Sequence, residues 1–64
     1  MLTNSRDIIA RLRREGFELV SIRGSHHKLF NPRRRWMVIV PHPKSDLPTG
    51  TVSAIYRQAG WRKD

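Results

Sequence analysis

The order of hydrophobic patterns along the chain predicts an α+β fold with the element order α-β-β-β-α. Apolar residues recur at helical spacing near both ends, and three segments between them are rich in β-branched and aromatic residues. Short runs of turn-forming residues separate these three segments, and such short connections are typical of β-hairpins. We therefore expect a three-stranded antiparallel sheet with two helices on one face, in a single domain that spans residues 1–64.

The first helix is predicted from Ser5 to Glu15. Asn4 or Ser5 can cap its start, and Gly16 can end it. Its buried face is expected to carry Ile8, Ile9 and Leu12. Its arginines form a basic face, either solvated or laid against a phosphate backbone: Arg6, Arg11, Arg13 and Arg14.

The second helix is predicted to begin at Thr49 or Gly50 and to end at Gly60. Its apolar stripe comprises Val52, Ile55, Tyr56 and Ala59. Trp61 follows the capping glycine directly, so its ring can fold back onto that stripe.

The three strands are predicted at Phe17 to Arg23, His27 to Asn31 and Arg35 to Val40. The breaks that separate and end them are Gly24-Ser25, Asn31-Pro32-Arg33-Arg34 and Pro41-His42-Pro43. The outer strands carry apolar residues on both faces, so one apolar set is expected to stay uncovered. Such a face is a candidate surface for a partner or for a second copy of the chain.

Alternation along the middle strand separates the two adjacent histidines. If the strand alternates from His26, then Lys28 faces solvent and His26 shares its open face. His27 then points with Leu29 toward the helices. His26 is therefore the better candidate for chemistry, with His27 as the second candidate.

The charge of the chain favours a nucleic acid as partner. The chain contains thirteen Lys and Arg but only five Asp and Glu, which gives a net charge of +8. Most of this excess is arginine, which pairs with phosphates through two hydrogen bonds and stacks on bases. Docking onto an acidic protein is the alternative explanation. A 64-residue chain buries only roughly 60% of its unfolded surface, so we also expect stabilisation by a partner or a second copy.

Other classes of protein are disfavoured. The chain has no cysteine, which excludes disulfide scaffolds, zinc ribbons and thiol nucleophiles. The longest apolar run, Met37 to Val40, is too short to span a bilayer, and the N-terminus lacks the pattern of a signal peptide. The sequence therefore predicts a cytoplasmic, soluble protein without a membrane segment.

The histidines suit metal-independent cleavage of RNA, because histidine exchanges protons near neutral pH. The residues expected to bind RNA around them are Gly24, Ser25, Lys28, Arg23, Arg33, Arg34 and Arg35. The five carboxylates show no clustering typical of two-metal nucleases, so no metal or other cofactor is predicted. The structural alternative is that the histidine pair is a surface or half-buried feature, and His42 between two prolines is more simply a turn residue.

Several motifs together resemble the HicA toxins of bacterial and archaeal toxin-antitoxin systems. They are Ser5-Arg6-Asp7-Ile8-Ile9, Glu15-Gly16-Phe17, Gly24-Ser25-His26-His27, the run from Val40 to Thr51, and Gln58-Ala59-Gly60. They cover almost the whole chain in family order. The resemblance implies a double-stranded-RNA-binding-like fold, a metal-independent ribonuclease (mRNA interferase) acting on mRNA, and neutralisation by a HicB antitoxin. The family's catalytic histidine, directly after Gly-Ser, maps onto His26.

The chain departs from the family at two places, and in a third place from ordinary duplex-RNA binders. Leu29 stands where an aromatic residue is common, and residues 31–35 replace a hairpin that often contains glycine. The second helix also begins without the lysines that ordinary duplex-RNA binders use to grip phosphates. We expect a toxin ribonuclease that assembles as a homodimer or with its antitoxin. The alternatives are a non-catalytic RNA-binding module and a domain that docks onto an acidic protein.

Overall fold

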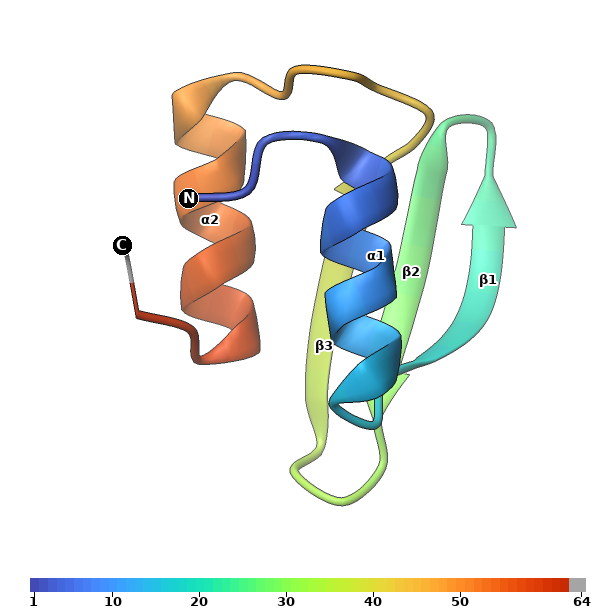
Figure 1. Ribbon diagram of the computed structural model, residues 1–64. Coiled ribbons are helices and arrows are strands. Elements are labelled where there is room, and N and C mark those ends of the chain that lie inside the picture. The colour runs from blue at the N-terminus through green and yellow to red at the C-terminus, as the bar shows by residue number, and fades with distance from the viewer. Residues whose placement is uncertain (63–64) are drawn as a thin grey trace.

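The computed structural model describes residues 1–62 and confirms the predicted order of elements. These are α1 (Ser5–Arg14), β1 (Glu18–Arg23), β2 (His26–Asn31), β3 (Trp36–Pro41) and α2 (Thr49–Ala59). The strands form one antiparallel sheet in the order β1-β2-β3. Both helices lie on the same side of this sheet and pack mainly against β3 (Figure 1). The fold is therefore the predicted α+β arrangement.

Caps place the helix ends close to the predicted positions. The Asn4 side chain accepts a hydrogen bond from the backbone N–H of Arg6 at 2.9 Å. Gly16 follows α1 with a φ of +96°, and Gly60 ends α2 with a φ of +74°, conformations that glycine adopts without steric cost. Predicting these ends was possible because capping depends on a few adjacent residues.

The hydrophobic core lies between the helices and the middle of the sheet. Its members are Ile8, Leu12, Phe17, Leu29, Val38, Val40, Leu47, Val52, Ile55, Tyr56, Ala59 and Trp61. Trp61 folds back as predicted, and its ring meets that of Tyr56 edge to face, with 5.0 Å between the ring centroids.

Alternation along β2 follows the predicted pattern. Leu29 is fully buried under the helices and His27 is half-buried, whereas His26 on the opposite face is exposed. Cross-strand pairing continues this alternation, because His26 pairs with Arg23 on one side and with Pro41 on the other. The two histidines therefore lie on opposite faces of the sheet.

The edge strand β1 departs from simple alternation. The register with β2 shifts between Leu19 and Ser21, which makes Val20 a bulge. Because of this bulge, Leu19 and Ile22 both pair with helix-side residues of β2, Leu29 and His27. The helices do not reach this edge strand, so Leu19 and Ile22 remain 38% and 56% exposed. On β3 the set containing Met37 and Ile39 faces away from the helices and is also exposed.

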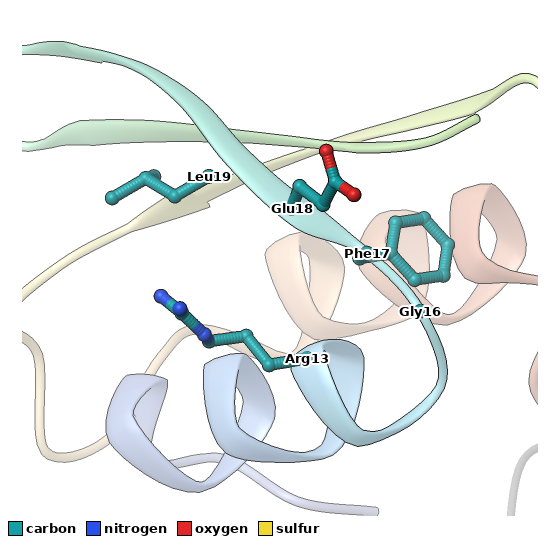
Figure 2. Close-up of a pocket in the computed structure, with 5 residues that line it drawn as sticks. All are labelled: Arg13, Gly16, Phe17, Glu18 and Leu19. Carbon is teal, nitrogen blue, oxygen red and sulfur yellow. The ribbon is translucent and has the colours of Figure 1, made fainter.

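A hollow of about 580 Å³ separates the end of α1 from β1. Figure 2 shows Arg13 extending from α1 toward the strand, on the same side as Leu19, while Glu18 points away from the helix. The hollow contains no histidine among its lining residues, and its one cation is Arg13. We assign no chemistry to it.

The third strand is shifted by one residue from its predicted range. Arg35 adopts a φ of +62° and belongs to the hairpin turn, so β3 starts at Trp36. At the other end Pro41 still pairs with His26, and the N–H of His42 donates to the carbonyl of Ser25 at 2.7 Å. The prediction that Pro41 stops the strand was wrong because the pairing runs one residue further.

Candidate functional site

His26 lies in a shallow basic hollow on the open face of the sheet. The hollow has a volume of about 160 Å³ and is lined by Ser21, Arg23, His26, Lys28 and Ile39. Strand pairing explains this grouping, because Arg23 stands opposite His26, and Lys28 stands between Ser21 and Ile39. An imidazole with a guanidinium and an ammonium beside it can combine proton transfer with attraction of a phosphate.

The turn formed by Gly24 and Ser25 places His26 at the start of β2. Gly24 has a φ of +56°, as expected for a glycine in a two-residue hairpin turn. No heavy atom lies within 4 Å of the position that a Cβ on Gly24 would occupy, so the turn is open to solvent. The exposed Ser25 is held through its carbonyl, which accepts the His42 N–H. Gly24 and Ser25 thus lie next to His26, where the sequence predicted an RNA contact.

A second histidine cluster lies on the helix side of the same end of the sheet. The rings of His27 and His42 meet edge to face, with 4.8 Å between their centroids. The Nδ1 atom of His42 lies 2.7 Å from the Oγ of Ser5. Ser5 Oγ also accepts a hydrogen bond from the Lys44 N–H at 2.8 Å. The cluster therefore joins the start of α1 to β2 and to the loop after β3.

Hydrogen-bond accounting distinguishes the two rings. Ser5 Oγ accepts from the Lys44 N–H and is also the hydrogen-bond partner of His42 Nδ1, so this ring nitrogen is satisfied. His27 Nδ1, by contrast, is buried and has no hydrogen-bond partner within residues 1–62. Such an atom is uncommon in a folded protein and marks His27 as a residue of interest.

Sequence reasoning missed the role of His42 and Ser5. His42 was interpreted as a turn residue, and Ser5 only as a possible cap. The two residues are 37 positions apart, and their contact depends on how the β3–α2 loop returns to α1. The Ser5 N–H and the Lys44 carbonyl, 2.9 Å apart, anchor that return. No local sequence pattern could have predicted the contact between Ser5 and His42.

The arginine hairpin is far from His26. Arg33, Arg34 and Arg35 follow the end of β2 at Asn31, whereas His26 begins the strand. Five residue steps of a strand span roughly 17 Å. The prediction that these arginines lie close enough to assist the histidines was therefore wrong, because closeness in sequence is lost along an extended strand.

Asn31 shapes this hairpin in place of a glycine. Its Oδ1 accepts hydrogen bonds from the N–H groups of Arg33 and Arg34 at 3.0 and 3.1 Å. Its Nδ2 donates to the carbonyl of Glu15 at 3.2 Å, which ties the hairpin to the end of α1. The three arginines are thus presented on a turn with defined backbone bonds.

Two further properties concern cofactors and membranes. Within residues 1–62 no three histidine or carboxylate side chains are grouped so that they could hold a metal ion. Neither helix in this described part of the chain has the length and apolar character needed to cross a bilayer.

Comparison with known proteins assigns the chain to a family. A search of curated proteins finds no match. The family model described as the HicA toxin of bacterial toxin-antitoxin systems matches residues 5–61, nearly the whole of the 64-residue chain. The matched region includes both histidine sites and all five elements of the fold. The chain therefore belongs to the HicA family of toxins from toxin-antitoxin systems.

Proposed function

We propose that this toxin is a metal-independent endoribonuclease that cleaves mRNA, with His26 as a general acid or base. The observation that carries the proposal is the placement of His26, exposed on the open sheet face in one hollow with Arg23 and Lys28. Membership of the HicA family supports the same class of activity. The proposal needs no cofactor.

Each member of the hollow has a chemical task in this proposal. Cleavage of RNA requires removal of a proton from the attacking oxygen, stabilisation of charge on the phosphorane, and protonation of the leaving 5′-oxygen. His26 performs one of the two proton transfers. Arg23 and Lys28 bind the phosphate and stabilise its added charge, and the Gly24-Ser25 turn lets the backbone of the substrate approach.

We propose further that an antitoxin of the HicB type inhibits the enzyme by covering the open face. Ile39 is 43% exposed beside His26, so a protein that buries this apolar side chain also blocks the histidine. A net charge of +8 favours an acidic partner. The same surface could instead join two copies of the toxin.

The first prediction compares His26→Ala with His27→Ala. We expect His26→Ala to keep the fold and RNA binding but to lower the rate of cleavage by about 100-fold or more, the usual contribution of a positioned general acid or base. His27 has its Nδ1 buried on the helix side, so His27→Ala should chiefly lower stability. The measurement is fragment formation from a labelled single-stranded RNA, with circular dichroism to verify folding.

The reverse result would contradict the assignment. A folded His26→Ala variant that cuts at the wild-type rate, beside a folded and inactive His27→Ala variant, would transfer the catalytic role to His27. If wild-type protein binds RNA and never cuts it, the chain is an RNA-binding module. If it shows no RNA affinity that falls with rising salt, it is a protein-docking domain.

A further inference from the structure

Trp36 is a large aromatic side chain that stays accessible at the arginine hairpin. It is 37% exposed, although its neighbour two residues on, Val38, is completely buried. The guanidinium of Arg34 lies over its ring, with 4.9 Å between the Arg34 Cζ and the ring centroid. The hairpin therefore presents an indole surface together with a cation.

The orientation of Trp36 is fixed by the end of α2. A Cβ built on Gly60 would come within 2.5 Å of the Trp36 ring, so glycine at this position makes room for the indole. Because the ring edge is packed against this backbone, Trp36 loses little freedom when a ligand stacks on it. Rigid, pre-oriented aromatic groups bind more tightly than mobile ones.

A hollow of about 320 Å³ opens beside the ring. Its lining comes from the end of α1, the hairpin and the end of α2: Glu15, Phe17, Asn31, Arg34, Trp36, Ala59, Gly60 and Trp61. This size is at the lower end of the range for small-molecule sites. Trp36 supplies the stacking surface and Arg34 the polar donor, because Trp61 is buried in the core and the Glu15 carboxylate already accepts from Trp61 and Arg11.

We propose that Trp36 and Arg34 form a binding site for an unpaired base of single-stranded RNA. This inference rests on the proposed function, since it adds a second contact for the same RNA substrate. The base stacks on the Trp36 ring, and Arg34, already over that ring, pairs with the adjoining phosphate. The neighbouring Arg33 and Arg35 attract the backbone on either side.

The site lies at the other end of the sheet from His26. Trp36 pairs with Asn31, the last residue of β2, whereas His26 is its first residue. Trp36 lies with Val38 on the helix side, whereas His26 lies with Ile39 on the open face. An RNA strand that reaches both sites therefore spans roughly 17 Å along β2 and also passes around the edge of the sheet, a path of several nucleotides. A stacking site at this distance holds single-stranded RNA at a second point and excludes continuous duplex, whose bases are not free to stack on a side chain.

The test measures binding of a short 2′-O-methylated single-stranded RNA, which lacks the free 2′-hydroxyl. Trp36→Leu should weaken its binding about 5- to 100-fold, the usual effect of losing one stacked base. Met37→Ala is the matched control, because Met37 is the next residue, is similarly exposed at 43%, and faces the other side of the sheet. It should bind like the wild type.

A fluorescence measurement covers the case in which Trp36→Leu does not fold. The chain has two tryptophans, so Trp61→Phe leaves Trp36 as the reporter. Addition of the RNA should quench its emission, whereas an RNA that is abasic throughout should quench it much less. Equal binding by folded Trp36→Leu and wild type, or absence of quenching on binding, would overturn the inference.

Failure of the inference can be told from failure of the proposed function. If the wild type binds single-stranded RNA and Trp36→Leu binds equally well, only the stacking site is wrong. If the wild type neither binds nor cleaves RNA, the proposed function fails and the stacking site fails with it. An indole that is quenched by an acidic protein partner but not by RNA would assign this surface to protein binding and overturn the inference.

Discussion

Ser5 is a buried residue, only 1% exposed, and its hydroxyl links the start of α1 to the loop that follows β3. Its Oγ meets His42 Nδ1 and the Lys44 N–H, and its own N–H donates to the Lys44 carbonyl. The His42 ring held in this way packs against His27. One small side chain thus positions a histidine that lies next to the middle strand.

Replacing the buried Ser5 by alanine should destabilise the protein by about 1–3 kcal/mol, because it removes the shared partner of two part-buried groups, the Lys44 N–H and His42 Nδ1. Urea unfolding at neutral pH measures this change. Ser45→Ala is the control, since Ser45 is exposed in the same loop and should change stability by less than about 0.5 kcal/mol. Equal stability of the two variants would show that the Ser5 hydroxyl contributes nothing.

The end of α1 is held to the rest of the fold by Glu15. Its carboxylate accepts hydrogen bonds from the Trp61 indole at 2.7 Å and from the Arg11 guanidinium at 3.0 Å. Burial by itself would raise the pKa of Glu15, but these two hydrogen bonds and the charges of Arg11 and Arg14 lower the pKa below its ordinary value of 4.5. The Arg11 guanidinium also stacks on Trp61, with 4.0 Å between its Cζ and the ring centroid.

A lowered pKa in the folded state gives a definite pH dependence. The stability that Glu15 contributes is present above about pH 4.5 and is lost as the pH falls through the lower pKa of the folded protein. Glu15→Gln should therefore unfold at lower urea concentration near pH 7 and lose less stability on acidification than the wild type. Glu18→Gln, at an exposed position, serves as control. Parallel acid profiles for Glu15→Gln and wild type would refute this role of the carboxylate.

The elements differ in how well the sequence predicts them. The limits of the helices follow from Asn4, Gly16 and Gly60, which act on adjacent residues. The bulge at Val20 and the start of β3 after Arg35 were not predictable, because both depend on pairing with β2 and on the Asn31 hydrogen bonds. The left-handed φ of Arg35 in particular has no signal in a sequence that lacks glycine there.

At the scale of the whole molecule, the basic residues predicted to bind RNA lie in two separate regions. One surrounds His26 on the open face, and the other is the hairpin of Arg33 to Arg35 with Trp36. Period-two alternation was sufficient to place His26 and His27 on opposite faces. It could not predict the hairpin's distance from His26 or the contact of His42 with Ser5, because both depend on the complete chain path.

The central claim is that the protein cuts RNA and uses no metal to do so. The most direct measurement incubates the purified toxin with single-stranded RNA, with and without a chelator, and records the rate of fragment formation. We predict fragments at the same rate in both samples, and a rate lowered by about 100-fold or more when His26 is replaced by alanine. RNA that stays intact with wild-type protein bound to it, or cleavage that stops when the chelator is added, would contradict this account.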